Sequence, residues 1–181
     1  SPLAADDWPA YRADGKRSAV SAENIPAKLF ANWTFQPRHA PRTAWPMPGE
    51  EMPRMHEDRA YPAVVAGGLL YFGNNVDNHV YALDAKSGKH VWDFAADGSV
   101  RFAPMVSNGR IYFGSDDGHV YCLDAPSGKL IWKYRAGPSG ERIIGRSRMV
   151  SVWPGRTGLL LEDGGVYCTA GSFPDEGLYI A

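Results

Sequence analysis

The sequence predicts an all-β fold, a β-propeller of four-stranded antiparallel blades, of which the chain holds about three. The main observation is an internal repeat: residues 81–92, YALDAKSGKHVW, return about 40 positions later at residues 121–132 as YCLDAPSGKLIW. A fixed period of about 40 residues, built from short strands, is typical of propeller blades. Composition agrees, because 20 Gly and 14 Pro supply many turns and 44% hydrophobic residues suffice for a core.

The first full repeat, residues 60–96, is expected to contain four strands. They cover residues 61–65, 69–72, 79–83 and 90–94, which are rich in β-branched and aromatic residues. The pair Gly67-Gly68 stands between the first two strands, where a two-residue hairpin requires positive φ. These residues therefore predict one complete blade.

The second repeat, residues 97–135, follows the same plan. Its expected strands cover residues 102–106, 110–113, 119–123 and 130–134, with Asn108-Gly109 in the first turn. We expect the second blade to lie beside the first.

The turn before each outer strand carries a fixed set of residues that we interpret as structural. An Asp opens the turn and can bond its own backbone, a Gly takes the left-handed position, and a Trp packs between neighbouring sheets with its N–H bonded to the adjacent turn. A stacking site for a ligand is the alternative interpretation of the Trp. The residues are Asp84, Asp124, Gly88, Gly128, Trp33, Trp92 and Trp132.

Both ends of the repeat array are incomplete. Residues 156–181 match a blade's first strand at 157–161, its second at 166–168 and the start of its third at 178–181, with Gly164-Gly165 as the first turn. Residues 1–35 end in an orphan outer strand, Trp33-Thr34-Phe35, which matches Trp92-Asp93-Phe94. An open arc leaves unpaired edges, and propellers typically need 4–8 blades to close. The chain is therefore a fragment of a longer propeller, which we favour, or a subunit of a ring completed by other copies.

A Pro-rich insertion separates the orphan strand from the first blade. Trp33 and Trp92 are 59 positions apart rather than about 40, and the extra residues fall within 36–59. This segment is expected to be extended, either as a lid or partner-binding arm or as a strap packed over the sheets. It contains Pro37, Pro41, Pro46, Pro48, Pro53, Met47, Met52, Met55, Trp45, His39 and His56.

An Arg-rich insertion, residues 136–155, precedes the incomplete blade. Arg101 and Arg156 both stand just before a blade's innermost strand, so both are expected to border the central channel. Guanidinium groups bind carboxylate or phosphate bidentately, so an anion-binding collar is one hypothesis. The alternative is that these arginines pair as solvated surface charges with Asp93, Asp97, Glu141, Glu162 or Asp163. The hypothetical collar comprises Arg101, Arg156, Arg142, Arg146 and Arg148.

The cysteines, the histidines and the acidic turn of the chain give little support for a redox or metal site. Cys122 and Cys168 fall in expected strands of different repeats, which favours two buried thiols over a disulfide. His79 and His119 are repeat equivalents, which favours a structural role, and no convergent set of metal ligands is visible. The Asp116-Asp117-Gly118 turn lacks the further acidic residues of a calcium loop.

The net charge and the hydropathy of the sequence exclude other classes of protein. The formal net charge of −1 predicts no general attraction to nucleic acid or an anionic membrane. No apolar run approaches the roughly 18–20 residues of a membrane-spanning helix. The N-terminus shows no signal segment, as expected if a signal peptide has been removed.

The repeated pattern A-x-D-x-x-S-G-K-x-x-W at Ala82–Trp92, with its second copy at Cys122–Trp132, resembles the tryptophan-docking motif of quinoprotein-type propellers. That family contains the pyrroloquinoline quinone (PQQ) dehydrogenases and their non-catalytic relatives. The chain is most similar to the bacterial PQQ-binding-like repeat proteins, also through Asp7–Arg12 and Trp153–Gly158. The resemblance implies an eight-bladed ring, a periplasmic or extracellular location and further blades beyond this portion.

The resemblance leaves two functions open. The first is a non-catalytic binding or scaffold module that presents loops to a protein or a small anionic ligand. The second is a PQQ-dependent dehydrogenase with calcium, whose catalytic residues lie in further blades. The family's vicinal cysteine pair is not matched, because Cys122 and Cys168 are 46 positions apart. The resemblance therefore favours the binding module, with the remaining blades or other copies as structural partners.

Overall fold

The computed structural model describes residues 7–21, 23–42, 60–145, 147–171 and 174–181. Within these ranges the regular structure consists of β-strands and one short 3-10 turn, η2 (Pro174–Glu176). The predicted all-β fold is confirmed. Part of the Pro-rich insertion, residues 43–59, lies outside the described residues, so the expectation of a lid or strap there stays a prediction.

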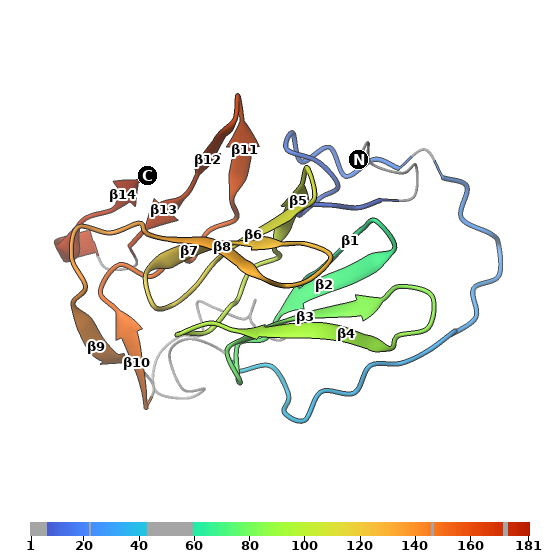
Figure 1. Ribbon diagram of the computed structural model, residues 1–181, viewed down its shortest axis with the longest axis horizontal. Coiled ribbons are helices and arrows are strands. Elements are labelled where there is room, and N and C mark those ends of the chain that lie inside the picture. Colours follow the sequence, from blue (N-terminus) through green and yellow to red (C-terminus); the bar gives the residue numbers. More distant parts are fainter. Residues whose placement is uncertain (1–6, 22, 43–59, 146, 172–173) are drawn as a thin grey trace.

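Two four-stranded antiparallel sheets form the centre of the molecule and lie side by side (Figure 1). Blade one consists of β1 (Ala63–Ala66), β2 (Leu69–Gly73), β3 (His79–Asp84) and β4 (His90–Ala95), paired in sequence order. Blade two consists of β5 (Met105–Ser107), β6 (Arg110–Gly114), β7 (His119–Asp124) and β8 (Leu130–Arg135), paired in the same way.

The first hairpin of each repeat uses the expected turn chemistry. Gly67 and Gly68 have φ values of 59° and 79°, and Asn108 and Gly109 have 49° and 72°. In the third repeat the two positive-φ residues are Asp163 and Gly164, with φ of 48° and 78°, so the predicted Gly164-Gly165 turn is wrong by one position. Asp tolerates the left-handed region, which lets this turn form without a second glycine.

A β-bulge orients the tryptophan of each outer strand. In blade one Ala82 pairs with Trp92 but Leu83 pairs with His90, so Val91 is the extra residue. The same shift occurs in blade two. Val91 is 46% exposed, whereas Trp92 is only 8% exposed and points toward the next sheet. The bulge thus reverses the alternation of faces at the point where the indole must turn inward.

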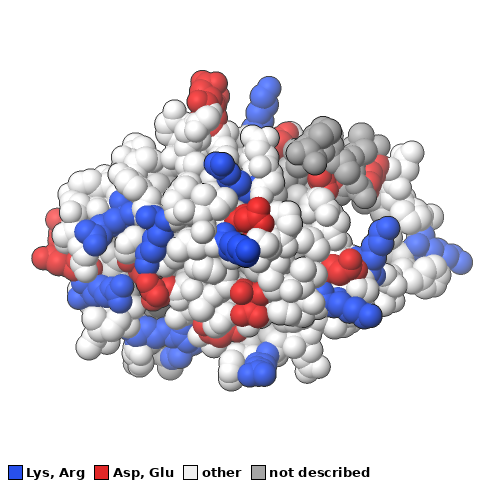
Figure 2. Space-filling model, in the orientation of Figure 1, with Lys and Arg blue, Asp and Glu red and all other residues white. Residues whose placement is uncertain are grey.

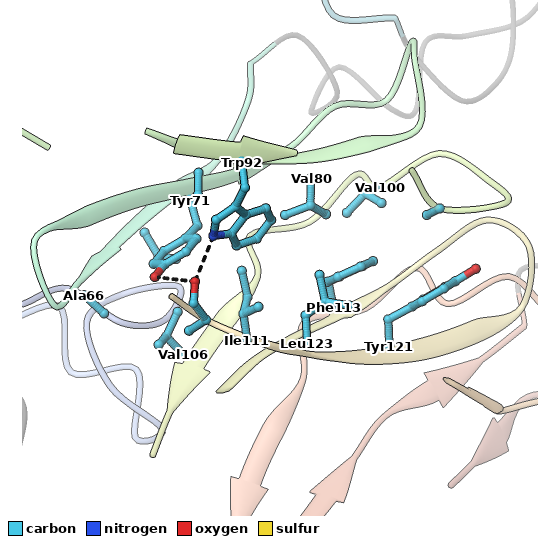
Figure 3. Packing of buried hydrophobic residues seen from close by; sticks show 14 residues of the cluster. Ala66, Tyr71, Val80, Trp92, Val100, Val106, Ile111, Phe113, Tyr121 and Leu123 are labelled. Atoms are coloured by element: carbon cyan, nitrogen blue, oxygen red, sulfur yellow. Dashed lines mark hydrogen bonds between the residues drawn. The ribbon is translucent and has the colours of Figure 1, made fainter. Parts of the chain in front are cut away.

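The main hydrophobic core lies between the two sheets (Figure 3). Tyr71 and Trp92 of blade one pack against each other with ring centroids 5.8 Å apart. Phe94 of blade one contacts Phe113 of blade two edge to face, at 6.3 Å. Neighbouring blades are therefore joined by large apolar side chains rather than by backbone pairing.

The third repeat is an incomplete blade. Strand β11 (Leu160–Glu162) pairs with β12 (Gly165–Tyr167), and β13 (Thr169–Ala170) pairs with β14 (Tyr179–Ile180). The backbones of Cys168 and Ala181 exchange two hydrogen bonds, of 2.9 and 3.0 Å, so the pairing with β14 extends to residue 181. A second, smaller core behind this unit contains Trp153, Cys168 and Val120.

Two segments differ from the sequence-based expectation. Residues 33–35 form no strand, because no third strand to pair with them lies among the described residues. The Arg-rich insertion forms a hairpin that we did not predict, β9 (Arg142–Gly145) with β10 (Arg148–Ser151). Its strands are only four residues long, too short for a clear alternating pattern.

The N-terminal segment, blue in Figure 1, runs across the inner strands. Trp8 and Val65 exchange backbone hydrogen bonds of 2.7 and 2.9 Å, and the Val106 N–H donates to Pro9 O at 2.7 Å. Residues 8–9 therefore bridge the innermost strands of both complete blades.

The two cysteines are free and buried, at 0% exposure for Cys122 and 6% for Cys168. The prediction of two buried thiols is confirmed. Burial raises the pKa of both thiols.

Candidate functional site

The loops at one end of the blades meet the β9–β10 hairpin, and we call this surface the loop face. It comprises residues 74–78, 96–101, 115–118, 142–145 and 147–151. The loops are joined by hydrogen bonds from Asp116 N to Ser99 O, 2.9 Å, and from Ser151 N to Asp116 O, 2.8 Å. The hairpin is thus fastened to the blades through the loop between β6 and β7.

A buried carboxylate, Asp116, lies at the centre of the loop face and is 1% exposed. Arg101 Nε donates to its Oδ2 at 2.7 Å, and Arg156 Nε donates to its Oδ1 at 2.8 Å. Arg156 also donates from Nη2 to Oδ2, at 3.3 Å. The two repeat-equivalent arginines therefore converge on a side chain of the chain itself, the Asp116 carboxylate. None of the five acidic residues considered as surface partners is the carboxylate on which these two arginines converge.

Arg148 of the hairpin lies on the same face with a different set of partners. Its Nη1 donates to Asn78 Oδ1 at 3.1 Å and to Ser99 Oγ and Asn75 O at 3.3 Å each, and its Nη2 donates to Val76 O. All of these acceptors are neutral. Burial, followed by the nearby guanidinium groups of Arg42 and Arg101, lowers the pKa of Arg148.

The other arginines of the predicted collar do not join this cluster. Arg142 is exposed on β9. Arg146 lies outside the described residues. Sequence reasoning missed Arg42, whose backbone N–H donates to Asn75 Oδ1 at 3.0 Å and whose carbonyl accepts from Arg101 Nη1 at 3.1 Å. Arg42 lies in the Pro-rich insertion, outside the repeat, so no period could have located it.

An open pocket of about 310 Å³ lies beside Arg148. Its polar lining includes Asn78, Ser99 and the Asp97 carboxylate. Lys133 donates to Asp97 Oδ2 at 2.6 Å and lies 3.1 Å from Asp117 Oδ2. The pocket can accommodate a small polar ligand or an inserted polar side chain.

The outer side of the hairpin exposes two apolar side chains. Ile144 and Met149 are directly opposite in the antiparallel register, and they are 75% and 53% exposed. On the opposite side Val150 is 7% exposed. Acidic and basic side chains are interspersed over the face of the molecule in Figure 2. The hairpin therefore presents a small apolar surface above a polar, tightly bonded base.

Asp117, next to Asp116, is bound within its own blade. Tyr121 donates its hydroxyl to Asp117 Oδ2 at 2.6 Å, and His119 N donates to Oδ1 at 3.1 Å. Burial would raise the pKa of Asp117, but the hydrogen bonds from Tyr121 and Lys133 outweigh it and the pKa is lowered. Among the described residues, no group of three His, Cys, Asp or Glu side chains could hold a metal ion.

The tryptophans lie at the turns of neighbouring repeats. Trp92 Nε1 donates to Ala125 O at 3.0 Å, and Trp33 Nε1 donates to Ala85 O at 3.1 Å. A Cβ on Gly128 would lie 2.6 Å from the Trp92 ring, and one on Gly88 would lie 2.5 Å from Trp33. Each indole thus lies directly on the glycine of a turn.

The aspartates of these turns bond locally. Asp84 Oδ1 accepts from Ser87 N at 2.7 Å and from Ser87 Oγ at 2.6 Å. Asp124 accepts from Ser127 N at 3.0 Å. Trp132 is half-buried against the smaller core and packs on Tyr112 at 6.0 Å.

The family model described as outer membrane protein assembly factor BamB matches residues 33–172. No curated protein matches the chain significantly. Among the described residues no helix is long and apolar enough to cross a membrane.

Solved structures of quinoprotein dehydrogenases share the fold. A europium-containing methanol dehydrogenase superposes with a TM-score of 0.68 at 19% identity, over 93% of this chain and 28% of that one. The quinohemoprotein alcohol dehydrogenase from Comamonas testosteroni gives a TM-score of 0.65 at 19% identity, over 92% of this chain and 23% of that one. The chain thus spans about a quarter of the length of these enzymes.

Proposed function

Because the chain belongs to the family of PQQ-like repeat β-propeller proteins described as outer membrane protein assembly factor BamB, we propose that it is a non-catalytic binding module. Its loop face presents the β9–β10 hairpin to a protein partner. The family description also supports a location in the periplasm or outside the cell.

The observation that carries this proposal is the hairpin. It is an addition to the blade repeat, it is bonded to blades one and two through Arg148 and Ser151, and it exposes Ile144 and Met149. An exposed apolar pair on a firmly held element is a suitable centre for a protein contact, because little conformational entropy remains to be lost on binding. The polar residues around it provide a rim.

The dehydrogenase alternative receives less support from this part of the chain. The quinone's carboxylates would need guanidinium partners, but Arg101 and Arg156 donate to Asp116, and Arg148 donates to neutral acceptors of the blade loops. The described residues therefore do not fit the quinone, and we derive no catalytic step from them.

Site-specific photo-crosslinking tests the binding module. A photoreactive amino acid replaces Ile144 or Met149 in the native host, and both positions are expected to crosslink to the same protein. Val91, an apolar residue of similar exposure on blade one, is the matched control and should not capture that protein. The proposal fails if Ile144 and Met149 crosslink no more than Val91.

A titration with PQQ and calcium tests the alternative. We expect no saturable uptake and no dye-linked oxidation of alcohols or sugars by the longest available form of the protein. Tight, calcium-dependent uptake that is lost in Arg101→Ala and Arg156→Ala would instead support the anion collar and reject a non-catalytic role.

A further inference from the structure

Arg148 has more hydrogen-bond donors than the acceptors of the chain use. A guanidinium group carries five N–H groups, two on each Nη and one on Nε. The acceptors on the blade loops take both Nη1 hydrogens and one Nη2 hydrogen. Among the described residues, no acceptor is bound by Nε or by the second Nη2 hydrogen. Arg148 therefore keeps two N–H groups, on neighbouring nitrogens, for a further acceptor.

The charge of Arg148 is not neutralised by a carboxylate. Among the described residues, all four of its acceptors are neutral and none of the ion pairs includes it. Burial and then the guanidinium groups of Arg42 and Arg101 lower the pKa of Arg148, and Asp116 and Asp77 offset this only in part. A partly buried cation in such surroundings is stabilised by an anion that binds it directly.

The pocket beside Arg148 gives access to this charge. Its volume of about 310 Å³ lies at the low end of ligand pockets, roughly 300–1,000 Å³, and suits one inserted side chain. Met149 lines the pocket and also forms the exposed apolar pair with Ile144. A protein that covers this pair therefore also lies over the mouth of the pocket.

We propose that the protein partner inserts an acidic side chain, Asp or Glu, into this pocket and that its carboxylate accepts from Nε and Nη2 of Arg148. This inference rests on the proposed function, because the same partner covers Ile144 and Met149. Two N–H groups on neighbouring nitrogens match the two oxygens of one carboxylate. They do not provide for the several carboxylates of the quinone.

The other charges of the pocket favour a carboxylate over a phosphate group. The Asp97 carboxylate also lines the pocket, and Lys133 donates to its Oδ2 at 2.6 Å. A phosphate group with a charge of about −1.5 to −2 is repelled by Asp97 more strongly than a singly charged carboxylate is. The chain's formal net charge of −1 provides no compensating long-range attraction for a polyanion.

Asn78→Asp tests the charge of the pocket without removing a bond of the hairpin. Asn78 Oδ1 accepts from Arg148 Nη1 at 3.1 Å and from Ser99 Oγ at 3.3 Å, and a carboxylate oxygen accepts the same bonds. Asn78 has a φ of 66°, a region that Asp tolerates. The variant therefore gives Arg148 a counter-charge within the chain, which should compete with the acidic side chain of the partner.

Asn108→Asp is the matched control. Asn108 also has positive φ, 49°, and it is exposed in the turn between β5 and β6, outside the loop face. The control therefore makes the same chemical change on the same kind of backbone, and it changes the net charge equally.

An NMR titration of the isotope-labelled chain with N-acetylglutamic acid amide measures binding to the pocket directly. We expect saturable shifts of the Arg148 Nε–H and of the Ser99 and Met149 amides. N-acetylglutamine amide, which has the same shape without the charge, should cause none, and inorganic phosphate should bind more weakly. Asn78→Asp should lower the affinity for the acidic probe about tenfold or more, and Asn108→Asp should leave it unchanged.

The same variants enter the photo-crosslinking experiment. Asn78→Asp should reduce the capture of the partner from Ile144 and Met149 at least fivefold, whereas Asn108→Asp should not. Unchanged capture in Asn78→Asp would overturn the proposal. Equal shifts with the acidic and the neutral probe, tighter binding of phosphate, or unchanged probe affinity in Asn78→Asp would also overturn it.

The two experiments separate this inference from the proposed function. The titration needs no partner, so a negative result there rejects the carboxylate pocket and leaves the hairpin as the binding element. If instead Ile144 and Met149 crosslink no more than Val91, the proposed function is rejected, and the titration still decides whether the pocket binds a carboxylate.

Discussion

At the scale of single residues, the buried charge of Asp116 determines how the loop face is built. Its carboxylate is 1% exposed and is bound by Arg101 and Arg156, whose side chains are 7% and 14% exposed. A buried ion pair becomes costly when one partner is removed, because the other charges lose their compensation. The same arginines therefore join the loop after β4 to the segment that enters the third blade.

We predict that Asp116→Asn destabilises the protein by about 3–5 kcal/mol, since it removes the buried carboxylate charge that both the Arg101 and the Arg156 guanidinium groups bind. Urea denaturation followed by tryptophan fluorescence measures the change. Glu162→Gln, which removes an exposed carboxylate, is the control and should shift stability by less than about 0.5 kcal/mol. Equal stability of Asp116→Asn and the parent would show that the arginines do not depend on this carboxylate.

Two buried tyrosines predict alkaline unfolding. Burial, followed by the nearby Asp124 charge, raises the pKa of Tyr71 to about 12. Burial and the hydrogen bond to Asp117 raise the pKa of Tyr121 to about 12. A raised pKa means that the fold favours the protonated form, so this stability is complete below pH 10.0 and is lost as the pH rises toward about 12.

An alkaline titration that records tyrosinate absorbance and fluorescence should therefore show late-ionising tyrosines, Tyr71 and Tyr121 among them, and unfolding in that pH range. Tyr71→Phe should make the loss of stability with rising pH less steep. If every tyrosine ionises near pH 10 while the protein stays folded, the two hydroxyls are not buried in the way described.

At the scale of elements, the turns before the outer strands determine how blades fit together. Gly128 and Gly109 have nearly equal positive φ values, 70° and 72°, but only Gly128 touches another blade. A Cβ at Gly109 would meet nothing within 4 Å, whereas one at Gly128 would meet the Trp92 ring at 2.6 Å. Substitutions at Gly109 and Gly128 therefore separate the cost of backbone strain from the cost of disturbing the contact between blades.

We predict that Gly109→Ala costs about 1 kcal/mol through the left-handed backbone alone. Gly128→Ala should cost about 2–4 kcal/mol, because overpacking against Trp92 adds to the same strain. Thermal and urea unfolding of the two variants provide the comparison. Similar losses in both would mean that the indole does not depend on the shape of the turn.

The β9–β10 hairpin is held through the side chain of Arg148 and the backbone of Ser151. We predict that Arg148→Met increases amide hydrogen exchange over residues 142–145 and 147–151 at least tenfold and leaves β2 and β3 protected, since its hydrogen bonds to Asn78 and Ser99 are lost. Arg142→Met is the control, because Arg142 is exposed on the same hairpin. Unchanged exchange in Arg148→Met would show that backbone bonds alone hold the hairpin.

At the scale of the whole molecule, the N-terminal segment connects blades that do not share a sheet. Trp8 pairs with Val65 of β1, and Pro9 accepts from Val106 of β5. Each backbone hydrogen bond contributes about 1 kcal/mol net. The segment therefore fixes the two blades relative to each other at their inner strands.

We predict that deletion of residues 1–13 speeds amide exchange of Val65 and Val106 at least tenfold and lowers stability by about 3–4 kcal/mol, from three lost backbone hydrogen bonds and the lost bond from Gly67 N–H to Asp7. Amides at the centre of β2 and β6 should keep their protection. If Val65 and Val106 stay protected in the truncated protein, the blades hold their arrangement without this segment.

Much of the fold could be predicted because each propeller blade is encoded by the same local sequence features. The 40-residue period located β1–β8 to within a few residues, and Asp84, Gly88 and Trp92 with their equivalents located the turn and the packed indole. Family membership followed from the same pattern. These are local features: turn chemistry, strand propensity and one aromatic position per repeat.

The candidate site depended on contacts that no local pattern encodes. The sequence by itself determined the blades and predicted equivalent positions for Arg101 and Arg156, just before the first strand of a blade. Only the tertiary structure decided that both bind Asp116, that Arg42 and Arg148 lie nearby, and that the Arg-rich insertion is a hairpin that exposes Ile144 and Met149. The physical reason is that the partners of a buried charge are chosen by proximity in space, across loops whose conformation depends on the packed blades beneath them.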